Sequence, residues 1–334
     1  MADPIGARST TTRSWPGVSV VMPVLNEERH LRAAVASVLD QDYPGELELV
    51  LALGPSRDKT DQVAAALQAA DARVHTVPSP TGRTPNGLNL AIGESRHPII
   101  ARVDGHSLLP PGYLRRAVEL LDETGADNVG GLMSARGVTD FEQSVAHAMT
   151  SKIGVGNAPF HVGGTEGPAD TVYLGVFRRT ALERVGGYDE TFARAQDWEM
   201  NFRIRESGGL VWFSPTLSVS YRPRSSLRLL AKQYFHYGRW RRHVARTHRG
   251  SVNLRYLAPP TALLGVIAGI VVSTFVSLWG LTLPLGYLAL VAVGAVAIGR
   301  GLPLKAKLLE PVVLVTMHMS WATGFLTSWR PAEE

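Results

Sequence analysis

Short apolar runs alternate with helix-like segments over residues 18–103, and this alternation restricts the fold more than any other feature of the chain. The runs are rich in β-branched residues and have the length of buried strands; they cover 18–24, 47–53, 74–77 and 99–103. Apolar residues recur at helical spacing in the segments between them, at 31–39, 63–67 and 88–92. Strand–helix–strand units of this kind assemble into a mostly parallel sheet with right-handed crossovers. The expected fold class is therefore α/β, with helices flanking a mixed, mostly parallel sheet.

Asp104 and His106 directly follow the fourth predicted strand and are separated only by Gly105. Extended backbone places residues i and i+2 on the same side, so these two side chains are positioned to bind one cation. A carboxylate with a neutral imidazole suits Mn²⁺ or Mg²⁺, and the bound ion would in turn hold a diphosphate. The alternative is a surface Asp-Gly turn in which His106 binds nothing. Ligands of parallel sheets bind beyond the carboxyl ends of the strands, where Asn26 and Asp58 also fall.

A second acidic cluster, Gln196-Asp197-Trp198-Glu199, opens a segment with helical character. A carboxylate at this place could act as a general base that removes the proton of an acceptor hydroxyl. Asp197 could equally cap the helix, with Glu199 favoured in the first turn by the helix dipole. The two roles are compatible, so these residues alone leave both open.

Four motifs occur together in one order: PVLNEE at 23–28, PSRDKT at 55–60, RVDGHS at 102–107 and AQDWEMNFRI at 195–204. On these motifs the chain resembles the family 2 inverting glycosyltransferases, which have the nucleotide-diphospho-sugar transferase (GT-A) fold. In type it is similar to membrane-anchored exopolysaccharide enzymes that resemble the succinoglycan glucosyltransferases. The resemblance covers residues 18–242.

The resemblance implies a role for each motif. The residues expected to bind the donor are Pro23, Asn26, Glu27, Asp58, Arg83 and Asp104. Asp104 and His106 occupy the Asp-x-Asp metal motif, and Asp197 takes the place of the catalytic base. The residues expected on the acceptor side are Gln196, Trp198 and Glu199.

Two positions depart from the family pattern. Relatives carry an Asp pair at the end of the second strand, where one carboxylate hydrogen-bonds the nucleotide base, but Leu53 and Gly54 align here. The resemblance therefore does not assign the base of the donor. His106 stands where a second Asp is common, which lowers the negative charge of the site and is expected to weaken Mg²⁺ binding preferentially.

The segment 226–256 is predicted to contain a basic amphipathic helix at a membrane interface. Its apolar side carries Leu227, Leu230, Tyr234, Tyr237 and Trp240. The formal charge of the chain is +5, from 34 Lys and Arg against 29 Asp and Glu, and much of the excess lies at 222–255. This position, next to an apolar region, favours anionic membrane lipids over nucleic acid as the partner. Gln233 followed by Gly238-Arg239-Trp240 loosely resembles the Gln-x-x-Arg-Trp motif of processive relatives, although the spacing is longer. Arg239 therefore either reaches the donor diphosphate or contacts headgroups.

Three apolar runs follow Leu257, at 258–278, 281–298 and 308–329, each close to the roughly 20 residues that span hydrocarbon. The basic segments before the first run and after the second are expected in the cytoplasm. The second pair of runs would form either spanning helices or a re-entrant hairpin. Residues 1–15 are rich in Ser, Thr and Arg, which predicts a disordered start. The predicted organisation is a disordered N-terminus (1–15), a cytoplasmic catalytic domain (16–225), an interface helix (226–256) and about three spanning helices (257–330).

The expected function is that of a multi-pass inverting glycosyltransferase in a bacterial inner membrane. It would move a sugar from a nucleotide-diphospho-sugar to a polyprenyl-linked acceptor in polysaccharide or cell-envelope glycan synthesis. One alternative is a polyprenyl-phosphate glycosyltransferase that makes a lipid-monophosphate sugar. Another, from a different class, is a non-catalytic membrane-anchored protein that binds nucleotide-sugars. The absence of Cys excludes thiolate metal sites, disulfides and a Cys nucleophile.

Overall fold

The computed structural model describes residues 14–328, so the predicted disordered start lies almost wholly outside the described residues. An eight-stranded sheet has the strand order β3-β2-β1-β4-β7-β5-β8-β6. Its strands are β1 (Val18–Val24), β2 (Leu47–Leu53), β3 (Val74–Pro78), β4 (Ile99–Arg102), β5 (Asn128–Ala135), β6 (Gly167–Pro168), β7 (Tyr173–Arg178) and β8 (Val211–Tyr221). The first four strands are parallel, β7 is antiparallel to both β4 and β5, and β8 is parallel to β5. The predicted fold class, α/β with a mixed sheet, is confirmed.

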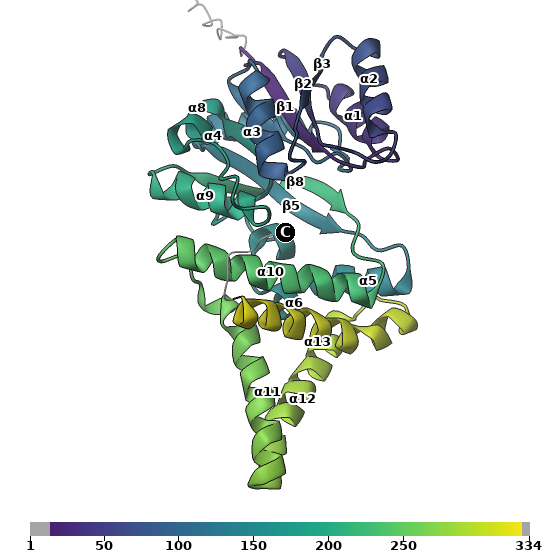
Figure 1. Ribbon diagram of the computed structural model, residues 1–334, viewed down its shortest axis with the longest axis vertical. Helices are drawn as coiled ribbons and strands as arrows, with labels where there is room; N and C mark the ends of the chain where they lie inside the picture. Colours follow the sequence, from purple (N-terminus) through teal and green to yellow (C-terminus); the bar gives the residue numbers. More distant parts are fainter. Residues whose placement is uncertain (1–13, 329–334) are drawn as a thin grey trace, which may run out of the picture.

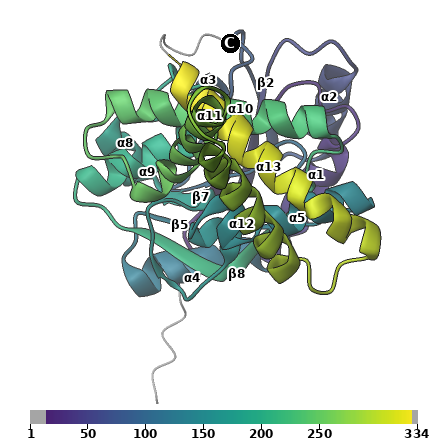
Figure 2. The same ribbon diagram turned by 90° about the horizontal axis from the view of Figure 1, so that it is seen from below.

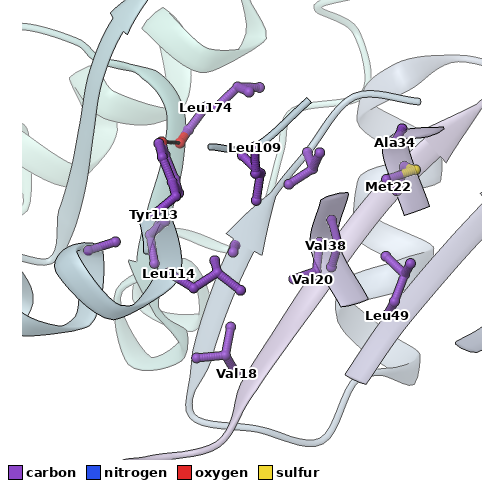
Figure 3. Close-up of a cluster of buried hydrophobic side chains, with 14 of the residues drawn as sticks. Val18, Val20, Met22, Ala34, Val38, Leu49, Leu109, Tyr113, Leu114 and Leu174 are labelled. Atoms are coloured by element: carbon purple, nitrogen blue, oxygen red, sulfur yellow. Dashed lines mark hydrogen bonds between the residues drawn. The ribbon is translucent and has the colours of Figure 1, made fainter. Parts of the chain in front are cut away.

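Helices cover both faces of this sheet because the side chains of its strands alternate between two apolar layers. Along β1, Val20 and Met22 point into one layer and Val21 into the other. The first layer packs against α1 (Leu31–Leu39), α2 (Thr60–Ala70) and α4 (Tyr113–Thr124). The second packs against α3 (Thr84–Glu94), α8 (Arg179–Val185) and α9 (Gln196–Glu206). In the first layer, shown in Figure 3, the Tyr113 hydroxyl donates to the Leu174 carbonyl at 3.0 Å and so joins α4 to β7.

The remaining helices lie at one end of the sheet, at the bottom of Figure 1. They are α5 (Asp140–Met149), α6 (Lys152–Val155), α7 (Pro159–Val162), α10 (Leu227–Thr247), α11 (Ala258–Phe275), α12 (Thr282–Ile298) and α13 (Leu304–Thr327). Two short 3₁₀ turns, η1 (Leu254–Tyr256) and η2 (Leu278–Leu281), precede α11 and α12. Figure 1 shows α11 and α12 projecting away from the sheet, whereas α10 and α13 lie across its lower end. Figure 2, seen from below, shows α11, α12 and α13 together on this side of the molecule.

The number of spanning helices differs from the sequence prediction. Within residues 14–328, two segments are long and apolar enough to cross a membrane, Ala258–Phe275 and Leu278–Ile298. The third predicted span, 308–329, instead forms most of α13, apart from its last residues. Val313, Leu314 and Met317 of α13 are buried in one cluster with side chains of α5 and α10, so this helix packs against protein on that side. The prediction of about three spans is corrected to two candidates.

The sequence predicted the apolar side of α10 at a membrane interface, whereas the structure buries most of it inside the protein. Leu230, Tyr234 and Trp240 are buried inside the protein, whereas Leu227 and Tyr237 remain exposed. Trp240 packs with Phe192, Trp198 and Phe202 beside α9, and Leu230 and Tyr234 pack with α13. The helix is therefore a structural layer between the sheet and α13, and its buried apolar side chains are not available to a membrane.

Two glycines allow α10 and α13 to approach each other closely. A Cβ added to Gly238 of α10 would lie 1.9 Å from the Trp321 carbonyl oxygen, and one added to Gly324 of α13 would lie 2.0 Å from the Phe235 carbonyl oxygen. No side chain fits at such distances, so the two backbones are in direct contact at this crossing. The layer formed by α10 and α13 is consequently tight at its centre.

Candidate active site

A cavity of about 900 Å³ extends from the carboxyl ends of β1, β2 and β4 to the helices α10 to α13. Its donor end is lined by predicted site residues, namely Pro23, Glu27, Arg83, Asp104 and His106. Its middle is lined by Gln196, Asp197 and Trp198 at the start of α9, and its other end by residues of α11, α12 and α13. The carboxyl ends of β1 and β4, together with the start of α9, thus bring three of the four sequence motifs to one space.

Asn26 and Asp58 join the two loops that follow β1 and β2, and neither side chain is part of the cavity lining. Asn26 has a left-handed backbone, with φ of 57°, and its side-chain oxygen accepts from the Arg57 N–H at 2.8 Å. The Asp58 carboxylate accepts from the N–H groups of Glu28 at 3.2 Å and Thr60 at 3.0 Å. Hydrogen bonding from the Thr60 hydroxyl lowers the pKa of Asp58. These contacts give both residues a role in shaping the donor loops.

Gly54 lines the donor end, at the position where the family resemblance implies a carboxylate in relatives. A Cβ added there would lie 3.0 Å from the Gly82 Cα atom and 3.0 Å from the Leu25 Cδ1 atom. The loops are therefore packed too closely for an Asp side chain at this position without movement of a neighbour. Any recognition of the nucleotide base at this place relies on other groups.

Asp104 and His106 lie on the donor side together with Glu27. His106 Nδ1 is 2.8 Å from Glu27 Oε1, and this hydrogen bond raises the pKa of His106. Asp104 Oδ1 accepts from a guanidinium N–H of Arg102 at 3.0 Å, which leaves its second carboxylate oxygen for a cation. Residues 14–328 contain no group of three or more His, Cys, Asp or Glu side chains arranged to hold a metal. Two protein ligands still fit Mn²⁺ or Mg²⁺, since such ions complete their coordination with substrate phosphates and water.

Arg102 connects the predicted metal motif to the predicted base. Only 6% of its side chain is exposed, and its guanidinium pairs with Asp104 on one side and with Asp197 on the other. The sequence analysis assigned no role to Arg102. In extended backbone, residues i and i+2 point to the same side, which places Asp104 on the side of His106 and also places Arg102 on the side of Asp104. The sequence pattern therefore already indicated that Arg102 lies beside the metal motif.

Asp197 lies in the first turn of α9, with its carboxylate turned toward Arg102. The N-cap is Ala195, whose left-handed backbone, with φ of 60°, is uncommon for a residue other than glycine. No side chain caps this helix, so Asp197 does not fill the capping role that the sequence left open. Burial raises the pKa of Asp197 and outweighs the opposing effect of Arg102. A carboxylate with a raised pKa is a stronger base.

A sequence model described as Glycosyl transferase family 2 matches residues 19–186. The chain is also 31% identical over 316 residues to the succinoglycan biosynthesis protein ExoA of Rhizobium meliloti (strain 1021), with 93% of each chain covered. The chain belongs to glycosyltransferase family 2. A more distant relative is a dolichyl N-acetyl-α-D-glucosaminyl phosphate 3-β-D-2,3-diacetamido-2,3-dideoxy-β-D-glucuronosyltransferase of Methanococcus voltae, 23% identical over 72% of this chain and 77% of that protein.

The fold of this glycosyltransferase is also found in a solved structure. The mannosyltransferase PcManGT from Pyrobaculum calidifontis, in complex with GDP-Man and Mn²⁺, superposes with a TM-score of 0.63. The match covers 96% of this chain and 92% of that one at 19% identity. The GT-A fold expected from the motifs is thereby confirmed, and a divalent cation is supported for the family.

The three residues predicted on the acceptor side differ in their location: two line the cavity and one is buried away from it. Gln196 and Trp198 line the cavity, whereas Glu199 is 1% exposed and does not. The Glu199 carboxylate accepts two hydrogen bonds from the Arg203 guanidinium, at 2.5 and 2.6 Å, and a third contact joins it to His248 at 3.1 Å. Glu199 therefore connects α9 to the end of α10.

The structure divides the cationic side chains of α10 and η1 into those that line the cavity and those that do not. Arg239 is not part of the cavity lining; its backbone N lies 3.1 Å from the position of a Cβ added to Gly324 of α13. Arg241, two residues further along α10, does line the cavity, as does Arg255. The sequence did not indicate Arg241 or Arg255, because the family motif in this segment matches at Arg239.

Proposed function

We propose that this family 2 glycosyltransferase transfers a sugar, with inversion, from a nucleotide-diphospho-sugar to a polyprenyl-linked acceptor in polysaccharide or cell-envelope glycan synthesis. The observation that carries the proposal is the continuity of the cavity. One end is lined by Glu27, Arg83 and Asp104, and the other is lined by the two candidate spanning helices and α13. This arrangement suits an acceptor whose lipid lies in the membrane and whose sugar reaches the donor.

In this mechanism Asp197 accepts the proton of the acceptor hydroxyl while that oxygen attacks the anomeric carbon and the nucleoside diphosphate departs. A divalent cation held by Asp104 and His106 would neutralise charge on the departing diphosphate. Arg102 contacts both Asp104 and Asp197, so it positions the base relative to the leaving-group side.

The relatives support both substrates of the proposal. The mannosyltransferase was solved in complex with GDP-Man and Mn²⁺, which supports a nucleotide-sugar donor. The relative from Methanococcus voltae acts, by its name, on a dolichyl-phosphate-linked sugar, which supports a lipid-linked acceptor. The relative from Rhizobium meliloti is a succinoglycan biosynthesis protein, which supports a place in exopolysaccharide synthesis.

The exposed apolar surface supports attachment to a membrane. Phe275 and Trp279, at the turn between α11 and η2, are 80% and 81% exposed. On α13, Leu304 and Leu308 are exposed one turn apart, with Lys307 exposed beside them. Apolar side chains bordered by lysine suit the boundary between acyl chains and anionic headgroups. We assign α11 and α12 to the bilayer, α13 to its cytoplasmic surface, and the catalytic domain to the cytoplasm of a bacterial cell.

The test uses membranes that contain the full chain or the Asp197→Asn variant, with Mn²⁺ and a panel of labelled nucleotide-sugars. Label extracted into organic solvent is expected from one donor with the wild type, and at least about 100-fold less with the variant. Asp61→Asn, which changes an exposed carboxylate on α2, is the matched control and should leave transfer unchanged.

Mild acid then separates two kinds of lipid product. A lipid-monophosphate sugar releases the label as a free monosaccharide, whereas a sugar added to an existing lipid-linked sugar is released still joined to that sugar. Absence of transfer from every donor in membranes that contain suitable lipid acceptors would contradict the proposed acceptor class.

A further inference from the structure

We propose that Arg241 and Arg255 form a subsite for the phosphate end of the lipid-linked acceptor, at the place where the cavity passes from the catalytic residues to α11, α12 and α13. The inference rests on the proposed function, because it concerns the acceptor of that reaction. It assigns the acceptor's phosphate to a place separate from the donor residues Glu27, Arg83 and Asp104.

Arg241 is held in one orientation by two aromatic rings. Its guanidinium carbon lies 4.4 Å from the centre of the Trp198 ring and 4.3 Å from the centre of the Tyr256 ring. Stacking of this kind holds the planar guanidinium while its N–H groups at the edge stay free to bind. The Nη1 atom is buried and has no hydrogen-bond partner among the described residues. A buried cationic donor without a partner indicates that a bound anion completes the site.

Arg255 supplies a second cation beside the first. It lies over the Tyr256 ring at 4.9 Å, and its Nη2 donates to the Tyr256 hydroxyl at 2.8 Å. Its Nε atom is also buried without a partner in the part of the chain that the structure describes. Burial lowers the pKa of Arg241, and the charge of Arg255 acts in the same direction, against the opposing effects of Tyr256 and Asp170. An anion within reach of both guanidinium groups would favour their charged forms.

The position relative to the base suits an acceptor. Arg241 packs on Trp198, and Trp198 directly follows Asp197 in the first turn of α9. A phosphate bound by Arg241 would therefore leave the adjoining sugar close to Asp197. The donor diphosphate is instead expected at Asp104 and His106, across Arg102 from the base.

The cavity beyond the two arginines is mostly apolar, with Tyr287 and His318 paired to each other at 3.2 Å, which favours a lipid phosphate over a free anion. Its lining there includes Pro259 and Ala262 of α11, Leu290 of α12 and Met317 and Trp321 of α13. A free phosphate gains nothing from this surface, whereas an isoprenoid chain would bury apolar area against it. The anion site and the apolar passage are thus parts of one binding surface.

The experiment measures binding to the purified full chain, with saturating Mn²⁺ and a saturating concentration of the nucleoside diphosphate that binds the chain most tightly in a direct binding panel. The two probes are farnesyl diphosphate and inorganic diphosphate. Farnesyl diphosphate is expected to bind at least about 10-fold more tightly than inorganic diphosphate. Arg241→Gln should weaken farnesyl diphosphate binding by about 10- to 100-fold and leave the affinity for the nucleoside diphosphate within about 2-fold. Arg255→Gln should act in the same direction.

Arg242→Gln is the matched control. Arg242 is the next residue on α10 and also lies over an aromatic ring, that of Phe325, but it does not line the cavity. Its variant should bind both probes and the nucleotide as the wild type does. If Arg241→Gln does not fold, as judged by thermal unfolding, the decision rests on Arg255→Gln, whose side chain is not enclosed between two rings.

Three results would overturn the proposal. Equal loss of nucleotide and farnesyl diphosphate affinity would assign the arginines to the donor. Equal binding of the two probes would assign the site to a free anion. Unchanged farnesyl diphosphate binding in the folded variants would show that no such subsite exists. None of these depends on transfer, so failure of the proposed function would be recognised separately, by the lack of lipid-extracted label in wild-type membranes.

Discussion

Glu310 of α13 gives the chain a dependence of stability on pH that does not involve catalysis. The side chain is 0% exposed, and neither carboxylate oxygen has a hydrogen-bond partner among the described residues. Burial raises its pKa from the ordinary value of 4.5 to about 8. In the folded protein at pH 7 the carboxyl group is therefore mostly protonated, whereas in the unfolded chain it is ionised.

The direction of the change in stability with pH follows from the number of protons bound in the folded and unfolded states. Between pH 4.5 and 8 the folded state holds one more proton at Glu310 than the unfolded state, so the free energy of unfolding falls as pH rises. Each pH unit corresponds to about 1.4 kcal/mol, which gives about 4 kcal/mol between pH 5 and pH 8. For about 315 ordered residues this change lowers the melting temperature by about 6 °C.

Thermal unfolding of the full chain in detergent, recorded from pH 5 to pH 8, checks this prediction. The Glu310→Gln variant loses the titrating group, so its melting temperature should fall less over this range than that of the wild type. Glu94→Gln, which changes an exposed carboxylate on α3, should leave the wild-type pH dependence in place. Parallel curves for wild type and Glu310→Gln would refute the reasoning.

Three further outcomes follow from the structure. Arg102→Gln leaves two carboxylates without their shared cation and should lower the free energy of unfolding by about 3 kcal/mol. The control Arg116→Gln changes a more exposed ion pair and should lower it by less than about 1 kcal/mol. Both values are measured by denaturant titration. Gly324→Ala should lower the melting temperature by an amount equivalent to at least about 2 kcal/mol, because no space exists for its Cβ; Gly93→Ala, with open space around it, should not. At limiting metal the wild type should transfer more sugar with Mn²⁺ than with Mg²⁺, and His106→Asp should reduce that ratio; equal activity with both ions in the wild type would contradict this.

The donor half of the protein was predictable because its information is local. Strand β1 covers residues 18–24 and β2 covers 47–53, as predicted, since alternating burial and chain length determine such elements. The carboxyl ends of parallel strands meet at one edge, which brought Glu27 and Asp104 together as expected. The same logic fails for Asn26 and Asp58, because the sequence pattern cannot say whether a polar side chain at this edge faces a ligand or a neighbouring loop.

The half formed by α10 to α13 was less predictable because these helices pack against segments that are distant in sequence. The run that forms α13 has the length of a span but is less apolar than the two candidate spans, and its burial against α10 depends on contacts across some 80 residues. Arg241 and Arg239 differ only in their direction around one helix, and that direction is set by the packing of Gly238 on α13. Composition alone cannot distinguish these cases.

The contact between α10 and α13 bears on how this enzyme can be divided. Met317, His318 and Trp321 of α13 line the same cavity as Asp197, and Gly238 and Gly324 bring the backbones of the two helices together. A truncation after residue 256, chosen to produce a water-soluble transferase, would remove one wall of the cavity and expose Leu230 and Tyr234. The two candidate spanning helices are consequently not exchangeable on their own: chimaeras among relatives should carry α10 to α13 as one unit, because otherwise one wall of the cavity would be lost with them.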